Sequence, residues 1–355
     1  MNLSHFVVFG VLVSLMLTAC GGAGPTVPLT SPENPTAPVA TAGQQTQSVS
    51  TYDSQPRKII LGMGFIPNIQ FAPFYVADSK GYFSENGLEI EFNYKMEDDL
   101  LKLVGTDKLQ FAIGSGDQVI LARSQGLPAV YVANFYRQFP VSIASLREKN
   151  IKSPQDLEGK SVGIPALYGA SYIGWEALVY ATGVDAEKVD LQTIGFTQLA
   201  AIEQGLVDAA VVYIVNEPVR LRLAGKEVNE IRVSEYINLV SNGIITNEKT
   251  IEEEPELVRK MVQSFLRGLR DTLADPQSAL DISLKYVPEA GGENRPGTEA
   301  VLQASIELWK GEPLGVSKRE DWQVSQDFMK EMGLIDHSTE VDKLFSNAFI
   351  NYPSN

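Results

Sequence analysis

The sequence has almost no cysteine and almost no histidine. Its 355 residues include one cysteine, Cys20, and two histidines, His5 and His337. A single cysteine excludes a disulfide within the chain. Because His5 lies in a segment that we expect to be removed, the counts also exclude a histidine-rich metal site and a catalytic pair of histidines. We therefore expect neither a metal site nor a catalytic residue, and a binding protein is favoured over an enzyme.

Positive charge is scarce as well. The 29 lysines and arginines stand against 44 aspartates and glutamates, which gives a formal net charge of −15. Nucleic-acid binding needs lysine and arginine clusters, so we expect no nucleic-acid partner. The sequence has no G-x-S-x-G elbow, no P-loop and no H-E-x-x-H pair, which are the signatures of three large enzyme groups. The hydrophobic share of 44% is ordinary for a folded protein.

The N-terminus carries a targeting signal. Residues 6–19 form the apolar run FVVFGVLVSLMLTA, directly before Cys20. This run is shorter than the roughly 20 residues of a membrane span and has the length of a signal-peptide core. Residues 17–21, LTACG, resemble the lipobox of bacterial lipoproteins. The resemblance implies that residues 1–19 are removed and that Cys20 carries acyl chains such as palmitate. The protein would then be anchored to the cell membrane on its extracytoplasmic face; the alternatives are an ordinary cleaved signal or a buried apolar helix.

A tether is expected to follow the cysteine. Residues 20–56 are rich in proline, threonine, serine and glycine, and their only charged residues are Glu33 and Asp53. The segment shows no apolar period, so it cannot build a core, and we expect it to be disordered. A flexible chain of this length would reach about 30–35 Å from its point of attachment.

The rest of the chain predicts an α/β fold of two lobes. Strands and helices alternate from Arg57 onward, and apolar residues recur every four positions over residues 257–273. A smaller unit, lobe 2 (residues 146–242), is inserted into lobe 1 (residues 57–145 and 243–355), so the chain crosses between them twice. Ligands of open α/β sheets bind beyond the carboxyl ends of the strands, which predicts a cleft between the lobes. The predicted strands cover residues 58–62, 88–94, 111–114, 128–135, 142–146, 161–164, 190–195, 209–214 and 236–246.

Polar and aromatic residues follow several of these strands. Such side chains, with the free N–H groups at helix starts, suit a flat polar ligand. Each also has a structural alternative: Asn68 could shape its turn, Asp117 could cap the next helix, and any single tyrosine could belong to the core. The candidate ligand-binding residues are Asn68, Gln70, Ser115, Asp117, Tyr136, Gln138, Tyr168, Ser171, Tyr172, Tyr213, Asn216 and Glu217.

Five segments resemble motifs of thiamine-pyrimidine-type periplasmic substrate-binding proteins. They are N-x-Q-x-A-x-F-Y-V-A-x-x-x-G-Y-F at residues 68–83, ARSQGLP at 122–128, DL-x-GK-x-VG at 156–163, G-x-VDA at 205–209 and PELV at 255–258. The resemblance implies a type II periplasmic-binding-protein fold with a two-crossing hinge. It also implies a monomeric receptor without a cofactor of its own, which serves an ABC permease and its ATPase subunit.

Within that family the chain resembles the riboflavin-binding lipoproteins of bacterial importers, which implies riboflavin as the transported ligand. Asn68, Gln70, Asn216 and Glu217 could read the pyrimidine edge of a flavin, and Ser115, Asp117 and Gln138 could bind its ribityl hydroxyls. The predicted cleft motifs have no cluster of positive charge, which disfavours a phosphate ligand. A thiamine-precursor pyrimidine would make similar contacts and stays the alternative.

The same family includes pyrimidine synthases that consume their own histidine in a metal-dependent reaction. The mature part of this chain keeps only His337, far from the five motifs. This argues against the enzyme branch.

Overall fold

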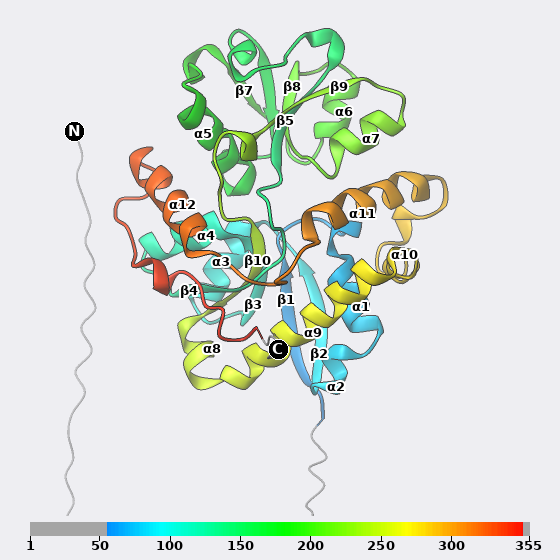
Figure 1. Ribbon diagram of the computed structural model, residues 1–355, viewed down its shortest axis with the longest axis vertical. Helices are drawn as coiled ribbons and strands as arrows, with labels where there is room; N and C mark the ends of the chain where they lie inside the picture. The colour runs from blue at the N-terminus through cyan, green and yellow to red at the C-terminus, as the bar shows by residue number, and fades with distance from the viewer. Residues whose placement is uncertain (1–54, 351–355) are drawn as a thin grey trace, which may run out of the picture. The chain divides into compact units, whose positions relative to one another are not determined.

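The computed structural model describes residues 55–350, so the expected signal peptide, Cys20 and most of the expected tether lie outside the described residues. The described part has two five-stranded sheets, each with its own helices, and we call them lobe 1 and lobe 2 (Figure 1). Within residues 55–350, no helix is both long enough and apolar enough to cross a membrane.

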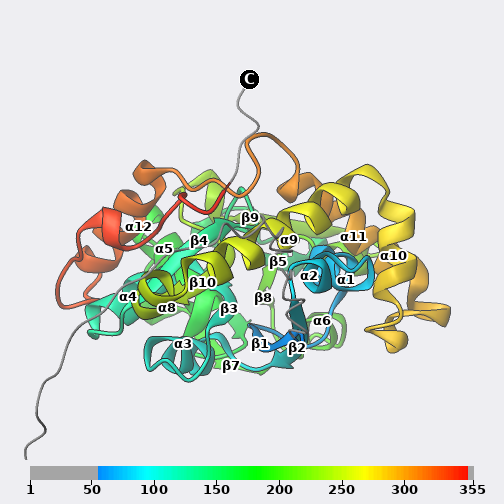
Figure 2. The same cartoon turned by 90° about the horizontal axis from the view of Figure 1, so that it is seen from below.

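Lobe 1 is built on a mixed sheet with the strand order β2-β1-β3-β10-β4. β1 runs parallel to β2 and β3, whereas β10 runs antiparallel to β3 and β4. Figure 2 shows α4 and α12 on one flank of this lobe and α10 and α11 on the other. The strands are β1 (Arg57–Met63), β2 (Leu88–Tyr94), β3 (Phe111–Ser115), β4 (Ala129–Asn134) and β10 (Asn242–Asn247), and the helices are α1 (Ala72–Ser79), α2 (Tyr82–Glu85), α3 (Glu97–Gly105), α4 (Gly116–Ser124), α8 (Glu248–Glu253), α9 (Pro255–Ala274), α10 (Pro276–Ser283), α11 (Arg295–Trp309) and α12 (Arg319–Glu331).

Lobe 2 repeats this plan with the strand order β7-β6-β8-β5-β9. β6 is parallel to β7 and β8, and β5 is antiparallel to β8 and β9. The strands are β5 (Val141–Leu146), β6 (Ser161–Ile164), β7 (Asp190–Thr193), β8 (Ala209–Tyr213) and β9 (Val228–Arg232), and the helices are α5 (Gly169–Thr182), α6 (Gln198–Glu203) and α7 (Glu217–Leu223).

Two chain segments connect the lobes and lie side by side. The first crossing is residues 135–140, between β4 and β5, and the second is residues 233–241, between β9 and β10. Gln138 Nε2 in the first crossing donates to Ser234 Oγ in the second at 2.7 Å. The backbone N–H groups of Phe135 and Tyr136 both donate to the carbonyl of Asn242, where the second crossing ends.

The crossings correct two expectations from the sequence. β5 pairs wholly within the sheet of lobe 2, so the first crossing comes before Val141 and not at residue 146. The strand expected over residues 236–246 begins only at Asn242, because the residues before it bridge the lobes and have no partner strand. Leu239 and Val240 are apolar because they are buried in the core beside α4, not because they pair in a sheet.

The core of lobe 1 reaches up to the cleft. Phe74 and Phe265, from α1 and α9, stack with their ring centroids 4.6 Å apart. Phe135, in the first crossing, stacks on Trp309 of α11 at 5.1 Å. Trp309 and Trp322 are fully buried. The first crossing thus packs on buried aromatic side chains, and this packing holds one side of the cleft in place.

Candidate ligand-binding site

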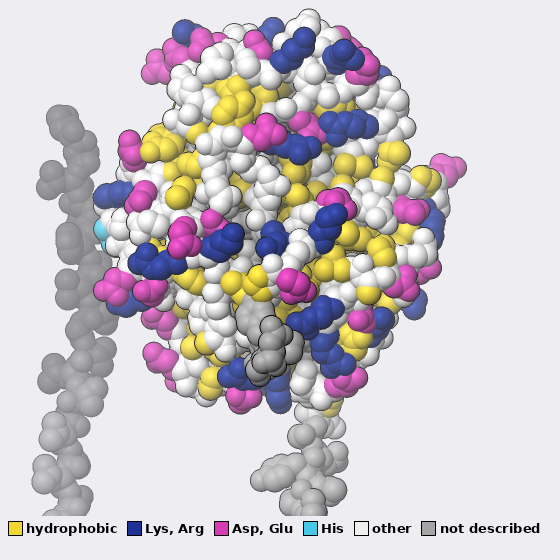
Figure 3. Space-filling model, viewed as in Figure 1, with side chains coloured by type: hydrophobic (Ala, Val, Ile, Leu, Met, Phe, Trp, Pro, Cys, Tyr) yellow, Lys and Arg dark blue, Asp and Glu magenta, His cyan; other side chains and the backbone are white. Residues whose placement is uncertain are grey.

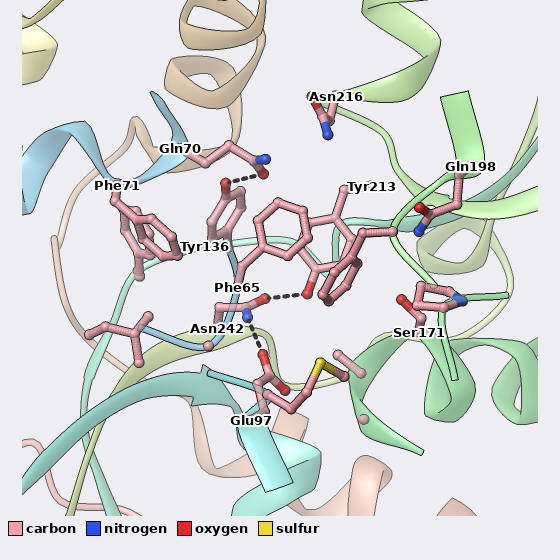
Figure 4. Close-up of a pocket in the computed structure, with 18 of the residues that line it drawn as sticks. Phe65, Gln70, Phe71, Glu97, Tyr136, Ser171, Gln198, Tyr213, Asn216 and Asn242 are labelled. Atoms are coloured by element: carbon pink, nitrogen blue, oxygen red, sulfur yellow. Dashed lines mark hydrogen bonds between the residues drawn. The ribbon is translucent and has the colours of Figure 1, made fainter. Parts of the chain in front are cut away.

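The cleft between the lobes holds a pocket at the carboxyl ends of β1, β3, β6 and β8. The space free of atoms is about 870 Å³, open solvent at the mouth included, which lies in the range of small-molecule sites. Figure 4 shows side chains from both lobes directed toward this space. Lobe 1 and the ends of the crossings contribute Gly64, Phe65, Gln70, Phe71, Met96, Glu97, Ile113, Phe135, Tyr136 and Asn242, and lobe 2 contributes Pro165, Tyr168, Gly169, Ala170, Ser171, Phe196, Gln198, Tyr213, Asn216 and Glu217.

The turn after β1 holds Gln70 in place. Asn68 Oδ1 accepts from the backbone N–H of Gln70 at 3.0 Å and from Gln70 Nε2 at 3.2 Å. Gln70 Oε1 in turn accepts from the hydroxyl of Tyr136 at 3.1 Å. Asn68 therefore shapes the turn and orients Gln70, while Gln70 itself lines the pocket.

A chain of hydrogen bonds crosses the floor of the pocket from one lobe to the other (Figure 4). The hydroxyl of Tyr213, on β8, donates to Asn242 Oδ1 at 3.3 Å. Asn242 Nδ2 donates to Glu97 Oε1 at 3.2 Å, and Ser115 Oγ donates to Glu97 Oε2 at 3.1 Å. Burial, reinforced by the nearby Asp117, raises the pKa of Glu97 to about 8.

A second buried acid lies on the lobe 2 side. Glu217 begins α7 and accepts a hydrogen bond from Asn216 Nδ2 at 2.9 Å. Asn216 Oδ1 accepts from Arg220 Nε at 3.1 Å, which orients the amide. Burial raises the pKa of Glu217 to about 7. Each lobe thus presents one carboxyl group whose neutral form is favoured by its surroundings.

Positive charge is missing from the pocket. No lysine, arginine or histidine lines it among residues 55–350. The outer surface differs, because Figure 3 shows acidic and basic side chains interspersed over the visible face of both lobes. A ligand with phosphate or sulfonate charge would meet two carboxyl groups and no counter-charge, so the pocket suits neutral or positively charged ligands.

Aromatic side chains line the pocket from both lobes. Phe65, after β1, meets Phe196, after β7, edge to face with ring centroids 4.8 Å apart. Phe71 and Tyr136 add to the lobe 1 side, and Tyr168 adds to the lobe 2 side. Rings that enclose a cleft from two sides favour a flat aromatic ligand.

Seven of the twelve candidate residues from the sequence line the pocket. They come together because they follow strands that point at the cleft from opposite sides. They are Gln70, Tyr136, Tyr168, Ser171, Tyr213, Asn216 and Glu217.

The other five candidates lie outside the lining, and their contacts explain why. Asn68 accepts a hydrogen bond from Gln70, and Ser115 donates one to Glu97. Both residues therefore support a side chain that lines the pocket. Asp117 is fully buried in the first turn of α4, where Oδ2 accepts from Gln118 and Oδ1 has no partner. Its side chain caps no helix either, because the N-cap position of α4 is Ser115.

Gln138 and Tyr172 complete the five. Gln138 ties the two crossings together through Ser234. Tyr172 follows Ser171 on α5 and is turned about 100° around the helix, so its ring packs against the core.

Several lining residues are not among the candidates predicted from the sequence, chiefly Phe65, Phe71, Glu97, Phe196, Gln198 and Asn242. Phe65 and Phe196 follow the ends of β1 and β7, and the rule that selected Tyr168 would have found them. Glu97 had no such signal, because it opens a helix inside an acidic run. Within the described residues, no group of three or more histidine, cysteine or acidic side chains is placed to hold a metal ion, and His337 is exposed outside the pocket.

Comparison with known proteins places the chain in a family. Residues 68–279 match the NMT1/THI5-like family. The riboflavin-binding protein RibY of Chloroflexus aurantiacus is 39% identical over 351 residues, which cover 96% of this chain and 96% of RibY. The chain belongs to the NMT1/THI5-like family. A second relative, the formylaminopyrimidine-binding protein of Halalkalibacterium halodurans, is 31% identical over 79% of this chain and 87% of its own length.

More distant relatives of the chain have the names of enzymes. The 4-amino-5-hydroxymethyl-2-methylpyrimidine phosphate synthase of Legionella pneumophila is 21% identical over 82% of this chain and 92% of its own length. Among solved structures, the aliphatic sulphonate binding protein SsuA of Escherichia coli matches with a TM-score of 0.65 and 14% identity, over 81% of this chain and 91% of SsuA. The periplasmic-binding-protein fold expected from the sequence is thereby confirmed.

Proposed function

We propose that this protein is the substrate-binding lipoprotein of an ABC importer and that it binds riboflavin between its lobes. The observation that carries the proposal is a pocket with aromatic side chains from both lobes, buried polar groups and no cation in its described lining. The isoalloxazine ring of riboflavin is flat, uncharged and bordered by N–H and C=O groups, so it matches such a lining. The 39% identity to RibY supports the same ligand.

Delivery would follow from closure of the lobes on the ligand. Two chain crossings allow the lobes to bend toward each other, and a ligand that touches both lobes stabilises the closed form. The closed receptor would then pass riboflavin to a permease powered by its ATPase subunit. The anchor on Cys20 would keep the receptor at the extracytoplasmic face of the membrane.

Calorimetric titration with riboflavin, flavin mononucleotide and formylaminopyrimidine tests the ligand. We expect riboflavin to bind, and flavin mononucleotide to bind at least about tenfold more weakly, because its phosphate brings negative charge to a pocket whose described lining has no cation to pair with it. Equal or tighter binding of flavin mononucleotide would contradict this view of the pocket.

A thiamine-precursor pyrimidine is the second candidate ligand. The 31% identity to the formylaminopyrimidine-binding protein favours it, and Glu217 with Asn216 could pair with the edge of an aminopyrimidine. Binding of formylaminopyrimidine without binding of riboflavin would replace the first candidate by the second. Formation of a pyrimidine product after addition of iron and pyridoxal phosphate would instead assign the chain to the enzymes of the family.

The lipid anchor predicts a change of location on mutation. Cys20→Ala removes the thiol that would be acylated, so the protein should move from the membrane fraction to the soluble fraction of cells. Immunoblots of the two fractions, washed with high salt, measure this. Retention of Cys20→Ala with the membranes would reject the anchor, and the loss of a disulfide within the chain cannot confuse the result because Cys20 is the single cysteine of the sequence.

A further inference from the structure

Glu97 is held rigidly at the floor of the pocket. It is the first residue of α3 and only 8% exposed. Both of its oxygens accept hydrogen bonds, one from Asn242 and one from Ser115. Gly64 leaves the space for it, because a Cβ at residue 64 would lie 2.6 Å from Glu97 Cγ. The carboxyl group therefore keeps one position relative to a ligand in the pocket.

The charged groups around Glu97 favour its neutral form. Asp117 faces it from α4, Asp98 follows it on α3, and the buried hydroxyl of Tyr213 approaches from β8. Lys102, on the next turn of α3, acts on Asp98, and no cation lines this pocket in the described part of the chain. Together with burial, the like charges hold the pKa of Glu97 at about 8, so the group carries a proton at neutral pH.

A neutral carboxyl group can donate one hydrogen bond. The two side chains bound to Glu97, Asn242 and Ser115, already donate to it. Glu97 lines the pocket, so its proton is available to an acceptor on a ligand. When Glu97 loses that proton, it turns from a donor into a buried, uncompensated charge, which costs far more to bury.

We propose that Glu97 is a specificity-determining residue that recognises the ligand only while it carries a proton. It selects neutral heteroaromatic ligands that direct a carbonyl oxygen or an unprotonated ring nitrogen at the pocket floor. Through Asn242 and Tyr213, the same group connects lobe 1 to lobe 2. Ligand affinity is therefore coupled to external pH and falls as the medium becomes alkaline. This inference rests on the proposed binding of such a ligand.

The experiment is a riboflavin titration of the full mature protein at several values from about pH 6 to about pH 9, repeated with Glu97→Gln. Wild-type affinity should fall at least about tenfold across this range. In a plot of affinity against pH, the pH at which the fall begins, which we call the break, should lie near the pKa of Glu97. Glu97→Gln keeps a neutral donor of similar shape, so its affinity should show no break near about pH 8; a pH dependence that remains at lower pH belongs to Glu217, whose pKa is about 7. Glu217→Gln, in the other buried acid, should weaken binding at every pH but retain the break.

The outcomes separate the inference from the proposed function. A wild-type affinity that does not change with pH, or a break removed by Glu217→Gln and not by Glu97→Gln, would overturn the role of Glu97. Absence of riboflavin binding at every pH would reject the ligand instead. Infrared difference spectra then still test Glu97, because its protonated C=O band should be present near neutral pH and missing in Glu97→Gln.

A further variant covers the case in which Glu97→Gln does not fold. Asp117→Asn removes the like charge beside Glu97, which should lower the pKa of Glu97. The loss of affinity should then begin at a lower pH than in the wild type. A break that stays in place or moves to higher pH would speak against the inference.

Discussion

Phe65 and Phe196 meet edge to face, one from each lobe, and both line the pocket. Phe196 is 40% exposed and lines the pocket, so part of its ring is open to a ligand. Two rings that lie on opposite lobes touch only when the lobes are close together. The pair can therefore stabilise the closed arrangement and cover one side of a bound ring.

Removal of this aromatic contact should weaken ligand binding without unfolding the protein. For Phe196→Ala we expect riboflavin to bind about tenfold more weakly, because aromatic pairs contribute about 0.5–1.5 kcal/mol beyond the area they bury. Calorimetry measures the affinity. Leu206→Ala is the control, since Leu206 is 67% exposed on the same lobe and lies outside the pocket. An unchanged affinity in Phe196→Ala would mean that the ring does not touch the ligand.

At the scale of elements, α9 and α1 approach so closely that one position admits only glycine. A Cβ on Gly268 of α9 would lie 2.1 Å from the carbonyl oxygen of Pro73 and 2.8 Å from Ala77 Cβ. Helix propensity alone would favour alanine over glycine by about 1 kcal/mol. The close approach of the two helices therefore decides the residue here, against local preference.

This contact predicts that Gly268→Ala destabilises the protein by about 1–3 kcal/mol, the usual cost of overpacking a core. Urea unfolding followed by circular dichroism measures the change. Gly297→Ala in α11 is the matched control, because the nearest tertiary neighbour of a new Cβ there would be Arg220 Nη1, at 3.7 Å. That variant should keep or slightly raise the free energy of unfolding; an equal loss in both variants would refute the packing argument.

Periodicity in the sequence predicts regular strands and helices. It fails where an edge strand has a weak apolar pattern or where a single polar side chain is buried. β2, which is predicted from alternating apolar and polar residues, and the short strand β6 begin and end at the predicted residues. β9 is not predicted, because it is a half-buried edge strand and its sequence, VNEIR, has little apolar pattern. α3 was missed too, and Glu97 with it, because Glu97, Asp98 and Asp99 look like the solvated first turn of a surface helix. Only the fold shows that the first of these acids is turned inward.

At the scale of the whole molecule, three buried carboxyl groups dominate the response of stability to pH. The pKa values are about 8 for Glu97, about 6 for Asp117 and about 7 for Glu217, each raised mainly by burial. In the unfolded chain these groups titrate near about 4. Between these limits the folded protein binds more protons than the unfolded chain, so the free energy of unfolding must fall as pH rises.

We therefore expect the melting temperature of the ligand-free protein to decrease from about pH 5 to about pH 8 and then to level off. Differential scanning calorimetry at constant ionic strength measures this. The double variant Glu97→Gln, Glu217→Gln should have a flatter profile than the wild type. A melting temperature that rises over this interval would show that the buried acids are ionised in the folded protein.

The paired crossings have a mechanical consequence. A single crossing between two lobes would permit rotation about any axis, including a twist. Two adjacent crossings resist twisting, so bending is the easier motion. The hydrogen bond between Gln138 and Ser234 connects the two crossings and adds to their resistance to twisting. Lobe 2 should therefore rotate about a single hinge axis and return to the same position relative to lobe 1 at each closure. Any surface formed jointly by the two lobes would then have a reproducible shape.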